Sequence, residues 1–155
     1  MKKVILCAVS VILLLTLCGC AGKMVPVPDN LVEATDAEVN INSEVKMYPA
    51  ENPDFTGRTK MVIQNETSNI VGYGDDVKIQ VLLNGKWYET KPYSFPAPLY
   101  EITPGSKAEF VMYWEEYWDN RPLDKGHYRL LKECLVRTES QKDAAFCYIA
   151  YEFDL

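Results

Sequence analysis

Short hydrophobic runs alternate with turn-forming residues along most of the chain, from residue 38 to residue 155. The runs are rich in β-branched and aromatic residues, and turn residues separate them at intervals of about eight to fifteen positions. We expect strands at residues 39–48, 59–65, 76–83, 86–90, 107–114, 127–136 and 145–155. About seven antiparallel strands of this kind predict an all-β fold, a β-sandwich in which two sheets enclose one core.

Local patterns also predict where individual side chains point. Asn84-Gly85 stands between two hydrophobic runs and tolerates the positive φ angles of a type I′ turn, so we expect a tight hairpin there. In the last run the odd-numbered residues from 147 to 155 are apolar, which predicts that this face of the strand points inward. By the same alternation, Phe110, Met112 and Trp114 should share one side of their strand.

The beginning of the chain has a different pattern. Lys2 and Lys3 precede an uncharged, apolar stretch that runs to Leu17. A positive start followed by such a stretch is typical of an export signal peptide. The stretch is too short for a permanent membrane-spanning helix, which needs about 20 apolar residues to cross about 30 Å of hydrocarbon. We therefore expect residues 1–19 to be a signal peptide that is removed.

Leu17-Cys18-Gly19-Cys20 resembles the bacterial lipobox, in which a small residue directly precedes a lipidated cysteine. Cys18 does not fit the lipidated position, because the bulky Leu17 precedes it. The resemblance implies that Cys20 becomes the first residue of the mature protein and carries acyl chains such as palmitate. Each buried methylene contributes about 0.8 kcal/mol, so two or three chains give lasting membrane attachment. The alternative is an ordinary cleaved signal peptide, with Cys20 left as a free thiol.

The composition of the mature part limits its partners. Removal of Lys2 and Lys3 leaves 14 basic residues against 22 acidic ones, a formal net charge of −8. The cations form no run, so we expect no nucleic-acid partner. Lipidation implies instead an exported protein on the extracytoplasmic face of a cell membrane, with the membrane as one partner through the lipid anchor.

The mature chain divides into a tether and one domain. Residues 20–37 contain Pro26 and Pro28 and are mixed in polarity, so that neither helix nor strand is sustained. We expect this segment to be a flexible tether that begins at the lipidated Cys20. Residues 38–155 suffice for one domain with a single core.

Asp124-Lys125-Gly126-His127-Tyr128 has the Asp-x-Gly-x-Tyr spacing of the tyrosine corner, which opens one strand of immunoglobulin-like domains. Further segments resemble the bacterial Ig-like domain of exported Firmicutes proteins, namely Tyr73-Gly74, residues 85–88, residues 102–105 and residues 123–132. The resemblance covers most of residues 38–155. It implies an immunoglobulin-like β-sandwich in which Asp124, Gly126 and Tyr128 have structural roles. It implies no catalytic or ligand-binding residues.

Cys134 and Cys147 are the two cysteines of the predicted domain. If the last two strands form a hairpin centred between Ser140 and Gln141, these cysteines face each other. We expect a non-hydrogen-bonded pair with about 4.5 Å between the Cα atoms, near the short end of the range for a disulfide. Export places the domain where disulfides form. Two interpretations stay open: a Cys134–Cys147 disulfide, or two buried thiols that pack as small hydrophobic groups.

Tyr117 and Trp118 lie just past the end of a predicted strand, in a segment that is rich in aromatic and acidic residues. Tyrosine and tryptophan here could form a platform for a sugar ring or a peptide, or they could pack in the core. Because both residues follow the strand, we expect them to be the exposed members of this aromatic group. They are our candidate ligand contacts.

The acidic pairs and the single histidine of the chain predict no metal site and no catalytic site. The acidic pairs Asp75-Asp76 and Glu115-Glu116 lack the spacing of a calcium loop, and the single histidine, His127, has no partner for a triad or a zinc site. We expect no catalytic residue, no metal site and no cofactor. The sequence favours a binding or structural module that contacts another envelope protein or a wall polymer. The alternative is a cell-envelope enzyme or a carbohydrate-binding accessory protein that uses exposed aromatic residues.

Overall fold

The computed structural model describes residues 24–35, 38–90, 98–137 and 144–155. The predicted signal peptide, Cys20 and the tip of the last predicted hairpin lie outside these residues. The described residues form ten strands and no helix, so no described segment is a helix that could cross a membrane.

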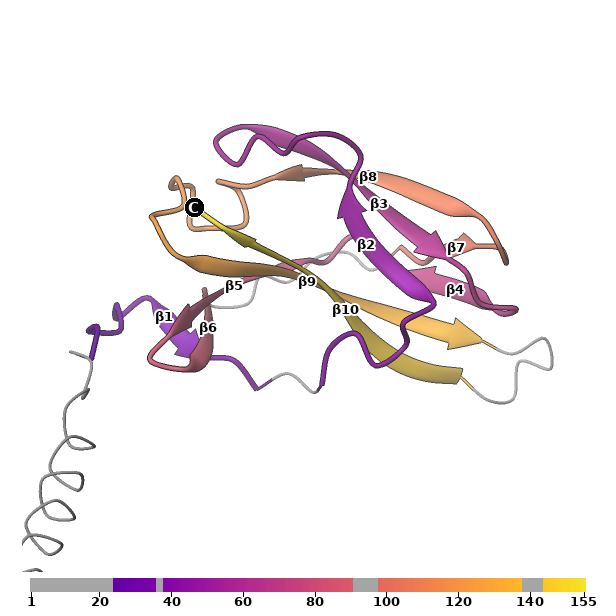
Figure 1. Cartoon of the computed structure of the whole chain (residues 1–155), viewed down its shortest axis with the longest axis horizontal. Helices are drawn as coiled ribbons and strands as arrows, with labels where there is room; N and C mark the ends of the chain where they lie inside the picture. The colour runs from indigo at the N-terminus through magenta and orange to yellow at the C-terminus, as the bar shows by residue number, and fades with distance from the viewer. Residues whose placement is uncertain (1–23, 36–37, 91–97, 138–143) are drawn as a thin grey trace, which may run out of the picture.

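The larger of two antiparallel sheets contains seven strands (Figure 1). Its order is β1-β6-β5-β9-β4-β7, and β10 pairs with β9. The bounds are β1 Leu31–Glu33, β4 Ile70–Tyr73, β5 Lys78–Leu83, β6 Lys86–Thr90, β7 Tyr100–Ile102, β9 His127–Arg137 and β10 Ala144–Asp154. β9 lies at the centre, because β5 pairs with its first half, β4 pairs with its second half and β10 pairs along its whole length.

The smaller sheet packs over the larger one and contains three strands in the order β2-β3-β8. Their bounds are β2 Val45–Pro49, β3 Arg58–Asn65 and β8 Lys107–Tyr113. β8 pairs with β3 along one of its sides, and no described strand pairs with its other side. β8 is therefore an edge strand. The two sheets make the β-sandwich that the sequence predicts.

The core lies between the sheets and is built from inward-facing residues of both. Trp114 is fully buried, and its indole Nε1 donates a 2.9 Å hydrogen bond to Oγ1 of Thr59. The Trp114 ring also packs edge-on against Phe153, with the ring centroids 5.2 Å apart. In β10, Ile149 and Phe153 are buried as the odd-numbered pattern predicts, although Leu155 at the chain end is exposed.

Two local predictions can be followed directly in the backbone. Asn84 and Gly85 have φ angles of 52° and 78°, and Leu83 pairs with Lys86, which is the two-residue hairpin expected from the sequence. The hydroxyl of Tyr128 hydrogen-bonds with the backbone of Asp124, four residues earlier, as in a tyrosine corner. A Cβ atom on Gly126 would lie 3.1 Å from Cε2 of Tyr128, so a larger residue at this position would crowd the ring.

The prediction of a flexible tether as far as residue 37 is wrong for its later part. Residues 31–33 form β1, which pairs with β6 so that Leu31 faces Thr90. Before β1, the amide side chain of Asn84 accepts a hydrogen bond from the backbone N of Val25 and donates one to its carbonyl O, at 2.9 and 2.8 Å. A three-residue strand carries too little alternation to be seen in a sequence. The described part of the tether is therefore docked on the domain.

Candidate functional site

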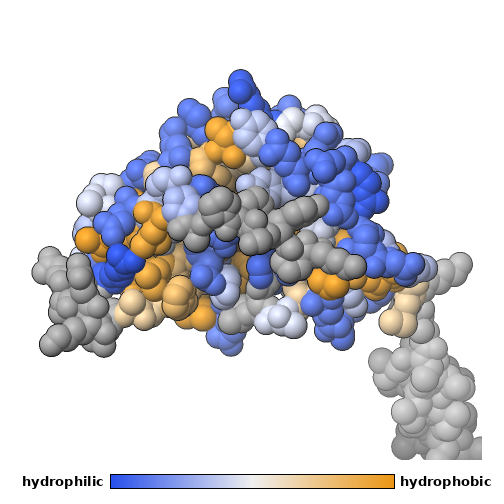
Figure 2. All heavy atoms as spheres, turned by 180° about the vertical axis from the view of Figure 1, so that it is seen from behind, coloured by the Kyte–Doolittle hydropathy of each residue, from blue (hydrophilic) through white to orange (hydrophobic). Residues whose placement is uncertain are grey.

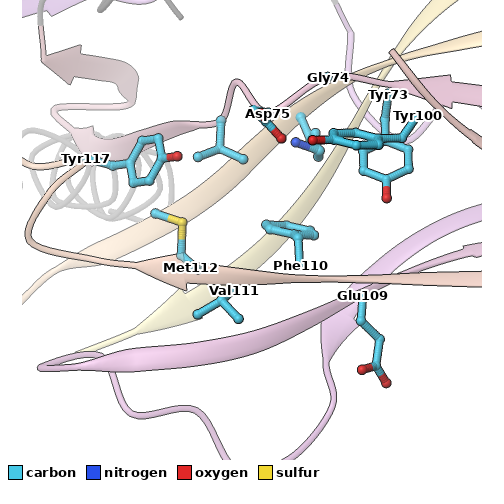
Figure 3. Close-up of a pocket in the computed structure, with 11 residues that line it drawn as sticks. Tyr73, Gly74, Asp75, Tyr100, Glu109, Phe110, Val111, Met112 and Tyr117 are labelled. Atoms are coloured by element: carbon cyan, nitrogen blue, oxygen red, sulfur yellow. The ribbon is translucent and has the colours of Figure 1, made fainter. Parts of the chain in front are cut away.

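A cavity of about 510 Å³ opens between the two sheets, beside the edge strand β8 (Figure 3). One wall is the stretch of β8 from Glu109 to Met112, and the facing wall comes from the end of β4 and the residues after it. The volume lies in the range of small-molecule and side-chain binding sites. The cavity exists because β8 and β7 are both edge strands, so the sandwich is not closed on this side.

The β8 wall is apolar. Phe110 and Met112 point into the space between the sheets, whereas Glu109 and Val111 point to the opposite side of the strand (Figure 3). This alternation is the one predicted for residues 110–114. Met112 is fully buried and Phe110 partly so, which leaves the phenyl ring as the apolar surface that a bound molecule would meet.

The facing wall carries hydroxyl groups and one carboxylate. The rings of Tyr73 and Tyr100 lie 5.3 Å apart between centroids, tilted by 36°. The negative charge of Asp75 is the main cause that raises the pKa of Tyr100, and a hydrogen bond between the two side chains adds to it. For Tyr73, burial is the main cause of a raised pKa. Both phenols therefore stay neutral near neutral pH. The hydroxyl of Tyr73 can donate a hydrogen bond to a ligand, whereas Tyr100 donates its one O–H to Asp75 and offers its oxygen as an acceptor.

Tyr117, one of the two predicted ligand contacts, lines this cavity and is half-buried (Figure 3). Burial raises the pKa of its hydroxyl, with smaller contributions from nearby carboxylates. The position fits a ligand contact. The prediction that Trp118 is an exposed ligand contact is wrong. Trp118 is only 6% exposed and packs edge-on against Tyr128, with the ring centroids 5.8 Å apart. The turn after β8 carries Trp118 back into the core instead of leaving it on the surface.

Lys132 is the cation of the cavity, although its side chain is only 1% exposed. It lies on β9 between Leu130 and Cys134, on the face that points into the sandwich. Its Nζ donates one hydrogen bond, 3.0 Å long, to the carbonyl oxygen of Asp76. Nζ also lies 4.8 Å from the centre of the Phe110 ring. Burial lowers the pKa of Lys132, and the carboxylates of the neighbouring acids oppose this shift.

The sequence contains a signal that Lys132 is a site residue, although the strand pattern alone did not predict it. The inward residues of β9 are Tyr128, Leu130, Lys132 and Cys134, so one charged residue interrupts an apolar face. A lysine is almost never fully buried unless it is paired, which makes this interruption informative. In β9 this charged position is the one that lines the cavity.

Cys134 and Cys147 face each other across β9 and β10, in the register that the hairpin centre predicts. Both are free thiols in this structure, so the disulfide stays a prediction. Burial, reinforced by the neighbouring thiol, raises the pKa of Cys134 to about 12. The pKa of Cys147 is raised for the same main reason, its burial.

Two further cavities lie on other parts of the surface. One of about 340 Å³ contacts Arg58 and Tyr113, and one of about 430 Å³ lies between residues 24–27 and Tyr88. Neither has a buried cation in its lining. The described residues contain no group of three or more His, Cys, Asp or Glu side chains that could hold a metal ion.

On the face seen in Figure 2, hydrophilic side chains predominate and hydrophobic side chains gather in a few patches. Phe146 and Leu99, which are among the most exposed hydrophobic residues, line one shallow hollow of about 80 Å³ beside β4. This hollow is too small for a ligand of ordinary size. The cavity next to β8 is therefore the candidate functional site.

Comparisons with known proteins agree with the fold. A family model described as "Bacterial Ig-like domain" matches residues 35–147. The matched range begins after β1 and ends within β10. A crystal structure of a protein from Archaeoglobus fulgidus is 14% identical over 72% of this chain and 94% of that one, and its TM-score of 0.24 is too low to support an argument. No curated protein matches the chain.

Proposed function

The chain belongs to the bacterial Ig-like domain family, and on that premise we propose that it is a lipid-anchored binding module of the cell envelope. In this proposal Cys20 carries the lipid, and the cavity beside β8 takes the ligand. A domain of this family is a binding or structural module, and the cavity favours the binding role. A purely structural spacer has no need for an open cavity that contains a buried cation.

The single observation that carries the proposal is Lys132. Burial of an ammonium group costs free energy unless a partner compensates, and natural proteins retain such a group mainly where it has a function. Among the described residues, the carbonyl oxygen of Asp76 is its one hydrogen-bond acceptor, although an ammonium has three N–H donors. Donors that are already desolvated make a strong interaction with an incoming acceptor.

Export and anchoring supply the setting of the proposal. The stretch up to Leu17 and the lipobox-like Leu17-Cys18-Gly19-Cys20 support attachment at the outer side of a membrane. The described segment from residue 24 runs along β6, so the domain is held close to its anchor instead of at the end of a long free chain. Its ligand is then another component of the envelope.

The experiment is a binding titration of the full chain in detergent micelles, followed by NMR of the aromatic and methyl groups. Soluble peptidoglycan fragments, oligosaccharides and short peptides are the probes. We expect a saturable shift of Tyr100, Tyr117 and Met112 signals, and Tyr100→Ala should weaken binding about tenfold or more, as expected for a central aromatic contact.

The matched control is Tyr88→Ala, because Tyr88 lines a different cavity at the other end of the larger sheet. It should leave the affinity unchanged. Equal losses in the two variants, or shifts that spread over the whole domain, would reject the cavity as the ligand site. A probe that is chemically converted instead of bound would favour an envelope enzyme.

A further inference from the structure

The free side of β8 lies at the mouth of the cavity. β8 spans Lys107–Tyr113, and β3 takes up the hydrogen-bonding groups of one side only. An edge strand exposes a row of N–H and C=O groups that can pair with a further strand. The cavity borders β8 at residues 109–112, so a strand added there would run beside it.

The two halves of β8 differ in how strongly their side chains discourage pairing with another chain. The first half carries Lys107 and Glu109, and Glu109 pairs with Lys60 at 3.2 Å. Charged residues of this kind discourage pairing with other chains. The second half, from Phe110 to Tyr113, has no charge, and it exposes Val111 and Tyr113, both 43%. The unprotected half is the part that borders the cavity.

Side chains of an added strand would alternate between two surroundings, because successive residues point to opposite faces of a sheet. One set would lie over Val111 and Tyr113 on the outer face. The other set would point inward, past Phe110 and toward Lys132 (Figure 3 shows Phe110 and Val111 on opposite sides of β8). A side chain that enters the cavity meets tyrosine hydroxyls, the Phe110 ring and a buried ammonium.

The buried ammonium of Lys132, and not the net charge of the lining, favours an acidic side chain. Lys132 makes no ion pair with any carboxylate of the described residues, and its Nζ is held by one carbonyl oxygen and two aromatic rings. Asp75 also lines the cavity, but its side chain is exposed and is hydrogen-bonded to Tyr100. A second carboxylate placed beside Lys132 would form a charge-assisted hydrogen bond with donors that have already lost their water.

We propose that β8 accepts an extended peptide segment of a partner protein as an added strand, and that a Glu or Asp side chain of this segment enters the cavity and pairs with Lys132. This inference rests on the proposed function, since it names the class of ligand for the same cavity. Backbone hydrogen bonds to β8 give affinity, and the cavity gives specificity, as in other cases of strand addition.

The test uses the full chain in detergent micelles and blocked peptides of about nine residues, long enough to run along β8. The peptides alternate Val and Thr and differ at the central position, which is Glu, Asp, Gln or Leu. We expect the Glu or Asp peptide to bind at least about tenfold more tightly than the Gln peptide. Hydrogen exchange should slow at β8 amides in the complex, and β2, the other edge of the smaller sheet, should not change.

Lys132→Met is the decisive variant, with Lys125→Met as the control, because Lys125 is an exposed lysine far from the cavity lining. Methionine is apolar and of similar length, so Lys132→Met should fold with a melting temperature at or above that of the wild type. It should remove the preference for the acidic peptide, and Lys125→Met should keep it.

Several results would overturn the inference. These are equal affinity for the Glu and Gln peptides, an acidic preference that survives in Lys132→Met, or protection of β8 by self-association of the chain. If no peptide binds but a saccharide shifts the cavity signals, the peptide inference fails and the proposed function stands. If neither kind of probe shifts them, the proposed function fails as well.

Discussion

Nδ1 of His127 lies 2.7 Å from Oδ1 of Asp154, which joins the first residue of β9 to the last residue of β10. The two residues are also register partners, and Glu152 approaches the other ring nitrogen at 3.3 Å. The ring of Trp87 lies 5.6 Å away. His127 is thus more than a turn residue, since two carboxylates of the neighbouring strand face its imidazole.

This arrangement gives a pH-dependent stability. The hydrogen bond to Asp154 is the main cause that raises the pKa of His127. Desolvation opposes it, and the hydrogen bond to Glu152 and the charges of both carboxylates add to the increase. Because the folded pKa is raised, the stabilisation is fully present below about pH 6.5, the ordinary value of histidine, and is lost as the pH rises through the folded pKa. His127→Gln should therefore lower the free energy of unfolding at about pH 6 and leave it unchanged at about pH 9.

An NMR titration measures this pKa directly, since His127 is the single histidine of the chain. Asp154→Asn should bring the pKa of His127 back toward its ordinary value. A wild-type pKa at or below about 6.5 would contradict the account.

The paired thiols should react slowly in the folded protein. The thiolate is the reactive form, and burial raises the pKa of Cys134 to about 12, so little thiolate is present. We expect alkylation of both Cys134 and Cys147 to be much slower in native protein than in denaturant. Mass spectrometry after timed alkylation measures the rates, and rapid labelling of native Cys134 would contradict the predicted burial.

Oxidation during refolding should trap the same pair. Cys134 and Cys147 are register partners, so a disulfide closes a short loop and should raise the free energy of unfolding by up to about 3 kcal/mol. Unreduced peptide mapping identifies the bond. Refolded, oxidised protein that keeps two free thiols would favour the other interpretation, in which the cysteines only pack.

Thr59 links two parts of the core through one hydroxyl group. Its Oγ1 accepts from Nε1 of Trp114 at 2.9 Å and from the backbone N of Asp54 at 3.1 Å, and it donates to the carbonyl O of Asp54. Thr59→Val keeps the shape but leaves the buried indole N–H without an acceptor. Denaturant unfolding should show a loss of about 1–3 kcal/mol.

Thr103→Val is the control for this change, because Thr103 is exposed and its hydroxyl bonds with Ser106 at the surface. It should change the stability by less than about 0.5 kcal/mol. A similar loss in both variants would mean that the methyl group, and not the buried hydrogen bond, is responsible.

Most of the β-sandwich could be predicted from the sequence, because long strands with one buried face repeat their signal. The alternation in β10 and the Asn84-Gly85 turn each identify an element and its register. The strands β1, β4 and β7 could not be predicted in this way. They have three, four and three residues, too few for an alternating pattern, and their pairing depends on neighbours that are distant in the sequence.

The candidate site was predicted only in part. Tyr117 could be predicted because aromatic residues past a strand end are a local signal. The same reasoning gave the wrong exposure for Trp118, because residue types alone do not determine the path of the backbone through a turn. Lys132 could not be identified as a site residue until the inward face of β9 was known, because only then is it clear that a charged residue lies on an apolar face. A cavity between two edge strands is a property of the whole topology.

Asn84 has a second role that can be separated from its turn. Its side chain bonds both backbone groups of Val25, and its own backbone needs a positive φ angle. Asn84→Gly supplies that angle without the side chain, so the hairpin should persist while the segment before β1 loses its attachment. Hydrogen exchange should speed up at Val25 and stay unchanged at Val81 in β5; equal protection at Val25 would show that the side chain is dispensable.

Attachment of the Ig-like domain to a membrane through Cys20 is the central claim of the proposed function. The most direct measurement is the intact mass and N-terminal peptide of the protein purified from bacterial membranes after expression of the full-length chain. The account predicts that the first residue is Cys20 and that it carries diacylglycerol, while Cys20→Ser leaves an unlipidated protein. A mature protein that begins at another residue, or an unmodified Cys20, would contradict it.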